Sequence, residues 1–215
     1  MTSAAGTVTL KVSVQHPKNH TEDRNRSANV VVWLRPLDAP AQPLPTSKRY
    51  EMTQKDKQFH PHVLAVPVGA SVAFPNLDPL FHNVFSLYKG ERFDLGLYEA
   101  GSSRAVRFER PGVSFIFCNI HPQMSAYVIA LETPYFAVSD DRGDIRIPGV
   151  PAGRYRLEVW YERSEPQALA ALARDVTVTE GDTNLAAVSV PESEKFIPEH
   201  TDKYGKPYTA DRIPY

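Results

Sequence analysis

The chain has 215 residues, of which 42% are hydrophobic and 23% are charged, a composition typical of a globular protein with one or two domains. Its 24 lysine and arginine residues balance 25 aspartate and glutamate residues, so the formal net charge of −1 argues against a nucleic-acid partner and against a polybasic membrane anchor. No apolar run reaches the length of a membrane-spanning helix.

Short runs of β-branched and aromatic residues, separated by turn residues, predict an all-β fold made of one or two sandwiches. Helical periodicity is confined to one stretch of about two turns, Pro166–Arg174. In chain order, the predicted strands are Thr7–Val14, Val30–Leu34, Val63–Val66, Ser71–Phe74, Asn83–Leu87, Ala105–Phe108, Ser114–Phe117, Ala126–Leu131, Tyr135–Ser139, Asp144–Ile147, Arg154–Tyr161, Asp175–Thr179 and Ala186–Val190.

Three segments differ from these apolar runs. Residues 15–29 and 35–48 are polar or proline-rich and are predicted to be loops or linkers. The tail, residues 191–215, is polar but contains several aromatic side chains. We therefore expect the tail to pack along a surface, and a second copy of the chain, which would give a homo-oligomer, is one candidate for that surface.

The single cysteine, Cys118, excludes an intramolecular disulfide, a four-thiolate zinc site and a copper centre bridged by two cysteines. It follows the apolar run GVSFIF and opens the sequence Cys118-Asn-Ile-His121-Pro-Gln-Met124. A thiolate and an imidazole suit copper as in-plane ligands, and a thioether suits a longer axial position. A short loop that leaves a strand can present all three side chains to one point.

A second imidazole is available from His82, at the start of another apolar run after the turn FPNLDPL. Two histidines, one cysteine and one methionine form the complete ligand set of a blue-copper site. Taken singly, His82 could be a hydrogen-bonded histidine at a strand end, and Met124 a residue that fills a gap in the core. The joint pattern favours a copper site.

These residues also carry a family resemblance. The stretch from Gln54 to Leu131 resembles a cupredoxin of the plastocyanin and amicyanin group, in the motifs FHNVFS and CNIHPQM. The resemblance implies a Greek-key β-sandwich over residues 50–132 with one mononuclear type 1 copper. His82 and His121 would be the imidazole ligands, Cys118 the thiolate and Met124 the axial ligand. Asn83 would help to fix the ligand loops by hydrogen bonding.

The resemblance further implies an electron-transfer protein, not an enzyme, that exchanges single electrons with a redox partner protein in the periplasm or outside the cell. His121 would be the electron port, inside an apolar docking patch of Leu80, Phe81 and Pro122. The first ten residues contain no export signal, so the sequence itself leaves the compartment open. Two other functions stay open: copper binding and delivery, and a binding module of an envelope complex that has lost its metal.

Residues 133–190, with the turn sequences DRG and VPAGRY, resemble the carboxypeptidase-regulatory or transthyretin-like sandwich, an immunoglobulin-like fold. That family begins with strands like GTVTL and NVVVWL, which here precede the copper segment. We therefore expect residues 6–48 and 133–190 to form one discontinuous sandwich, with the copper domain inserted between them. The alternative is that the first strands are an N-terminal extension of the cupredoxin.

Two further groups of polar residues have competing interpretations. His60 and His62 lie two residues apart on an expected strand, where both side chains would share one face, so they indicate a second metal site or a solvated edge. Ser139, Asp140, Asp141 and Asp144 contain calcium-ligand types, but the spacing in DDRGD fits a hairpin turn better than a calcium-binding loop.

Overall fold

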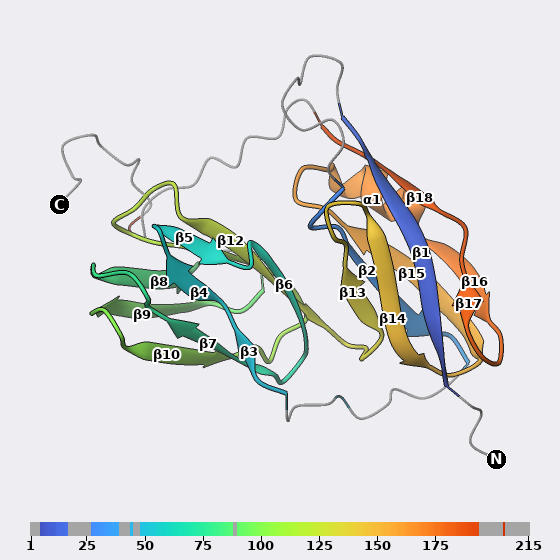
Figure 1. The fold of residues 1–215 in the computed structure, drawn as a ribbon, viewed down its shortest axis with the longest axis horizontal. Coiled ribbons are helices and arrows are strands. Elements are labelled where there is room, and N and C mark those ends of the chain that lie inside the picture. The colour runs from blue at the N-terminus through green and yellow to red at the C-terminus, as the bar shows by residue number, and fades with distance from the viewer. Residues whose placement is uncertain are drawn as a thin grey trace. The chain divides into compact units, whose positions relative to one another are not determined.

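The computed structural model describes residues 5–16, 27–38, 44, 48–87, 90–193 and 204. The described residues fall into two compact units. One is built from those up to 38 together with those from 133 to 193, and the other from those between 44 and 132 together with Tyr204. Both units are built mainly of β-sheets (Figure 1), which confirms the all-β prediction. Within the described part of the chain, no helix is both long and apolar enough to cross a bilayer.

The first unit contains two four-stranded sheets. In the first sheet, β1 pairs with β14 on one side and with β17 and β18 on its opposite side. The second sheet has the strand order β13-β2-β15-β16. The elements are β1 (Gly6–Gln15), β2 (Val31–Pro36), β13 (Phe136–Val138), β14 (Asp144–Val150), β15 (Gly153–Trp160), α1 (Pro166–Leu172), β16 (Arg174–Val178), β17 (Thr183–Asn184) and β18 (Val188–Pro191).

The core of the first unit follows the period-two pattern of its strands. In β1, Val8, Leu10 and Val12 are buried, whereas the residues between them are exposed or half-buried. Leu34 and Leu157, from β2 and β15, are paired across the second sheet and are also buried. The two sheets therefore share one apolar core, to which residues before and after the second unit both contribute.

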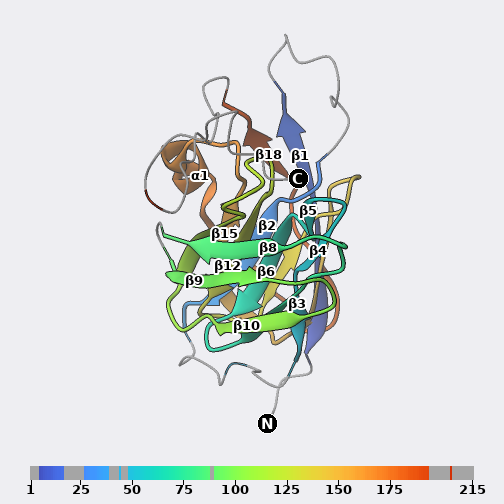
Figure 2. The ribbon, with the colours of Figure 1, turned by 90° about the vertical axis from the view of Figure 1, so that its left-hand side faces the viewer.

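The second unit contains a five-stranded sheet of order β6-β12-β11-β8-β9, a three-stranded sheet of order β10-β7-β3 and the hairpin β4-β5. Figure 2 shows this unit, with all of these strands labelled except β7 and β11. Its strands are β3 (Tyr50–Glu51), β4 (Thr53–Lys55), β5 (Gln58–His60), β6 (Val63–Pro67), β7 (Ser71–Pro75), β8 (His82–Ser86), β9 (Phe93–Tyr98), β10 (Ser103–Arg107), β11 (Gly112–Phe117) and β12 (Ser125–Leu131).

Every predicted strand overlaps an observed strand, and the helix is present, but β3, β4, β5, β9 and β17 were not predicted. Four of these have only two or three residues, too few to show a periodic pattern. β9 contains Gly96, whose φ of +66° interrupts the regular strand conformation that the sequence pattern presupposes. Tertiary pairing with β8 determines that this segment is a strand.

Three other predictions are corrected or fall outside the described residues. β5 ends at His60 and β6 begins at Val63, so the expectation that His60 and His62 share one face of a strand is wrong. The DDRGD segment forms a turn, in which a side-chain oxygen of Asp140 accepts hydrogen bonds from the backbone N–H groups of Arg142 and Asp144. It is not the expected hairpin, because β13 and β14, the strands on either side of it, belong to different sheets. The tail, which was predicted to pack along a surface, lies outside the described residues except for residues 191–193 and Tyr204.

Candidate metal centre

Two neighbouring strands and one loop bring the predicted ligands together. β11 pairs with β8 and with β12, and Phe117, the last residue of β11, is opposite both Phe85 and Ser125. The loop of residues 118–124 therefore begins and ends beside the same point of the sheet. His82 is the first residue of β8, the strand next to this loop.

The side chains of His82, Cys118 and His121 converge. The two Nδ1 atoms of the histidines lie 3.1 Å apart, and the Cys118 Sγ lies 3.8 Å from Nδ1 of His82 and 3.6 Å from Nδ1 of His121. A metal ion bound about 2 Å from two imidazole nitrogens and about 2.3 Å from a thiolate requires donor atoms roughly 3–4 Å from one another. The three side chains therefore fit a single metal ion.

The group is shielded from water. The exposed fractions of His82 and Cys118 are 0%, and that of His121 is 4%. Burial raises the pKa of the Cys118 thiol, although backbone N–H groups of Asn83, Ile120 and His121 partly offset this effect. Burial lowers the pKa of His121, and the neighbouring charges of His82 and Lys57 act in the same direction. His121 is thus held neutral, the form that binds metals.

The backbones of Met124 and Asn83 contact Cys118. Met124 is completely buried in the same core cluster as Cys118. Its backbone closes the loop, because its N–H donates to the carbonyl of His121 at 2.9 Å and its carbonyl accepts from the N–H of Cys118 at 3.2 Å. The side-chain amide of Asn83 donates to Asp94 at 2.7 Å, so Asn83 links β8 to β9 beside the centre.

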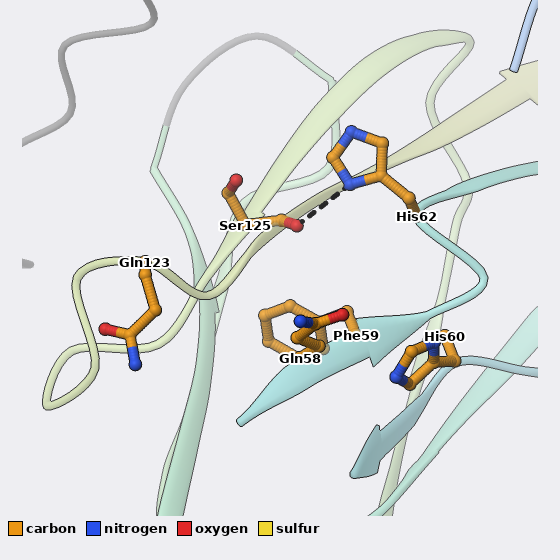
Figure 3. Close-up of a pocket in the computed structure, with 6 residues that line it drawn as sticks. All are labelled: Gln58, Phe59, His60, His62, Gln123 and Ser125. Carbon is orange, nitrogen blue, oxygen red and sulfur yellow. Dashed lines mark hydrogen bonds between the residues drawn. The ribbon is translucent and has the colours of Figure 1, made fainter. Parts of the chain in front are cut away.

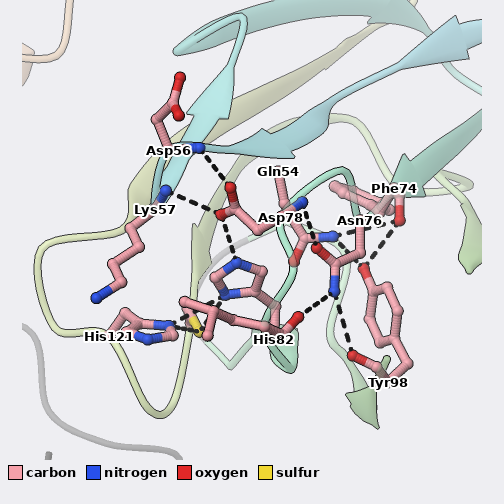
Figure 4. Close-up of polar contacts among 11 residues, drawn as sticks. Gln54, Asp56, Lys57, Phe74, Asn76, Asp78, His82, Tyr98 and His121 are labelled. Carbon is pink, nitrogen blue, oxygen red and sulfur yellow. Dashed lines mark hydrogen bonds and ion pairs between the residues drawn. The ribbon is translucent and has the colours of Figure 1, made fainter. Parts of the chain in front are cut away.

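Sequence reasoning missed Asp78, which contacts a predicted ligand directly. Its Oδ2 lies 2.7 Å from Nε2 of His82, and only 6% of the residue is exposed (Figure 4). Burial alone would raise the pKa of Asp78, but hydrogen bonds from the Lys57 N–H, the His82 ring and the Asp56 N–H hold it below its ordinary value. The only available signal was a carboxylate four residues before the histidine, in a turn.

A second set of buried polar contacts fixes the turn that carries Asp78. Asn76 accepts a hydrogen bond from the N–H of Asp78 at 3.1 Å, and its side-chain amide donates to the carbonyls of Leu80 and Tyr98 at 2.7 and 3.3 Å. Gln54 donates in turn to the Tyr98 hydroxyl and to the carbonyl of Phe74. Figure 4 shows this chain of contacts running from the metal centre to the interior of the unit.

The residues predicted to form a docking patch differ in exposure. Phe81 is 58% exposed, whereas Leu80 and Pro122 are half-buried. Leu77, in the same turn as Phe81, is also 58% exposed and was not included in the prediction. Exposed apolar side chains therefore occur both before and after Asp78 in the sequence, and one of them, Phe81, directly precedes His82.

A cavity of about 340 Å³ lies beside the ligand loop and is lined by Gln58, Phe59, His60, His62, Gln123 and Ser125 (Figure 3). Nδ1 of His62 lies 3.2 Å from the carbonyl oxygen of Ser125, and the ring packs edge-on against Tyr127. In the described part of the chain, the only group of three or more histidine, cysteine or acidic side chains within metal-binding reach is His82, Cys118 and His121. The second-metal interpretation of His60 and His62 stays untested.

No protein-family model matches the chain, and no curated protein matches it. Solved structures similar to it include a novel purple cupredoxin from Nitrosopumilus maritimus, with 23% identity over 38% of this chain and 99% of that one, at a TM-score of 0.35. A single-residue variant of amicyanin, in its oxidised state, has 19% identity over 39% of this chain and 82% of that one, at a TM-score of 0.37. A copper-containing nitrite reductase from Thermus scotoductus SA-01 has 24% identity over 45% of this chain, at a TM-score of 0.38, and the match spans only 25% of that enzyme.

Proposed function

We propose that this chain binds one copper ion through His82, Cys118, His121 and Met124 and carries single electrons between redox partners outside the cytoplasm. The observation that carries the proposal is the convergence of two imidazole nitrogens and one thiol sulfur within 3.8 Å, from a strand and a loop far apart in the sequence. This juxtaposition has no counterpart among the other described acidic, histidine and cysteine side chains.

The chemistry of the donors supports copper. Two imidazoles and one thiolate, with a methionine next to them, are the donor set of blue-copper electron-transfer sites. Burial raises the pKa of the Cys118 thiol, and a cation bound at its sulfur favours the thiolate form that binds metals. When bound, copper supplies a one-electron couple between its two oxidation states.

The surroundings of the site favour electron transfer over metal delivery. A delivery protein must release its ion to a competitor, whereas these three side chains are 4% exposed or less. The loop that holds two of them is closed by backbone hydrogen bonds between Cys118, His121 and Met124. A site of this kind changes little when the metal gains or loses an electron, because the protein fixes the ligand positions in advance.

We further propose that a redox partner protein docks near Phe81 and Pro122, where apolar side chains adjoin His82 and His121. Small, weak interfaces suit transient electron exchange. The half-buried Pro122 follows His121 directly, so a partner at this position approaches the metal through the His121 imidazole.

The test is a visible and electron paramagnetic resonance spectrum after Cu(II) is added to the purified protein. We expect an intense thiolate-to-copper charge-transfer band with one copper per chain. Cys118→Ser should abolish the band, while His62→Gln, which changes a histidine outside the centre, should keep it. A colourless one-to-one Cu(II) complex of the unmodified protein would show that the type 1 assignment is wrong.

A further inference from the structure

The carboxylate of Asp78 is shared between the His82 ring and the turn of the β4-β5 hairpin. One oxygen, Oδ2, lies 2.7 Å from Nε2 of His82 and accepts the backbone N–H of Lys57 at 2.9 Å. The other oxygen accepts the backbone N–H of Asp56 at 2.6 Å. A nearly buried anion thus joins a proposed metal ligand to a turn more than twenty residues earlier in the chain.

The turn is built to present these two N–H groups. Asp56 and Lys57 both have a φ of +55°, the left-handed conformation of a two-residue hairpin turn. Their side chains are exposed, so the contact with Asp78 is made by the backbone. The strands that flank the turn are anchored independently of Asp78, because Gln54 and Phe59 are 0% and 3% exposed.

The contact determines which nitrogen of His82 is available. A neutral imidazole carries its proton on one nitrogen and a lone pair on the other. A carboxylate at Nε2 holds the proton there, which leaves the lone pair on Nδ1, the atom directed at Cys118 and His121. Carboxylates that accept from the second nitrogen of a metal-binding histidine fix its tautomer and ring orientation in this way.

We propose that the β4-β5 turn positions the His82 imidazole through Asp78, so that a change in the turn alters the metal centre without altering any ligand. This inference rests on the proposed function for its effect on copper, whereas the positioning itself is a property of the metal-free protein. Asp78 and the turn are positioning elements and do not contact the metal.

The positioning is tested in the metal-free protein by long-range proton–nitrogen NMR of the histidine rings. His82 should be the Nε2–H tautomer in the unmodified protein. Asp78→Ala should lower the ratio of the Nε2–H to the Nδ1–H tautomer at least tenfold. Lys57→Pro should lower it in the same direction, because proline has no N–H and cannot adopt a positive φ.

Lys57→Gly is the matched control, because it also removes the lysine charge but keeps the N–H and favours a positive φ. It should keep the tautomer ratio of the unmodified protein. An Nδ1–H tautomer of His82 in the unmodified protein overturns the proposal, as does a Lys57→Pro variant that behaves like Lys57→Gly. If Asp78→Ala does not fold, the tautomer of the unmodified protein and this pair of variants still decide the question.

The effect on copper is tested separately. Asp78→Asn removes a negative charge next to a ligand, which should favour Cu(I) at least tenfold relative to Cu(II) and raise the reduction potential by about 59 mV or more. Asp140→Asn is the control, because Asp140 also accepts two backbone N–H groups in a turn but contacts no histidine. If the tautomer result holds but no blue band forms, the proposed function is wrong and the positioning stands. An unchanged potential in Asp78→Asn contradicts the inference while leaving the blue-copper assignment intact.

Discussion

The Nδ1 atoms of His82 and His121 lie 3.1 Å apart in a buried position, although 39 residues separate them in the sequence. An imidazole nitrogen and a thiol sulfur can each offer a lone pair, and the two Nδ1 atoms have the Cys118 sulfur within 3.8 Å of both. A bound cation satisfies all of these lone pairs at once. The three side chains are therefore arranged as a single bound cation requires.

Met124 provides a test of the axial position. Replacing it by leucine removes a weak donor that stabilises Cu(II) more than Cu(I), so Met124→Leu should keep the blue colour and raise the reduction potential. Met52→Leu is the control, because Met52 is equally buried in the same core. It should leave the potential unchanged. Cyclic voltammetry measures both, and an unchanged potential in Met124→Leu, or a site that no longer holds copper, shows that Met124 is not axial.

Copper binding should release protons, and the pKa values of Cys118 and His121 determine how many. The pKa of Cys118 is raised and that of His121 is lowered, so near neutral pH the metal-free site holds a protonated thiol and a neutral imidazole. Binding requires the thiolate, so about one proton should leave for each copper bound. Affinity should consequently fall about tenfold for each unit by which the pH decreases.

Calorimetry in two buffers with different ionisation enthalpies measures the proton count directly. Cys118→Ser serves as the control, since its hydroxyl does not ionise in this range and copper bound to it should release no proton from this position. Loading of the unmodified protein without proton release contradicts the assignment of Cys118 as a ligand.

The electron route can be tested with a charge on the proposed docking patch. Pro122→Glu places a carboxylate beside His121 and should slow electron exchange with the redox partner, while colour and potential stay nearly constant. Leu37→Glu is the control, because Leu37 is similarly apolar and 36% exposed but belongs to the other unit. Stopped-flow kinetics measures the exchange. If the rate falls only after charges are placed at His60 and His62, the port lies beside the cavity instead.

The discontinuous sandwich makes a prediction about folding. β1 lies between β14 and β17, and β2 lies between β13 and β15, so residues 133–215 alone lack a central strand of each sheet. We expect such a fragment to be insoluble or unfolded, because its apolar faces and sheet edges are exposed. A fusion of residues 1–48 to 133–215 through a short linker should fold. A well-dispersed NMR spectrum of the fragment alone would rule out the insertion.

The sequence alone was sufficient for the elements that depend on local pattern. Alternating apolar residues predicted most strands, and the spacing of Cys118, His121 and Met124 predicted a ligand loop, because neighbours in a short loop stay close in any fold. The same reasoning predicted His82 as a ligand, but it could not show how close His82 lies to Cys118 and His121. Short strands such as β3 and β17 were not predicted. They are strands because they pair with β7 and β1, and their own composition does not indicate this.

Only the tertiary structure determined which distant groups meet. The register of β8, β11 and β12 sets the positions of the two histidines relative to the thiol, and it also leaves His121 only 4% exposed. Asp78 lies in a polar turn whose pattern indicates nothing about a ligand, and its role depends on a hairpin turn at Asp56 and Lys57 that packs over it. A sequence pattern reports on residues a few positions apart, whereas these contacts arise from long-range strand pairing and from the burial of a charge that needs hydrogen-bond partners.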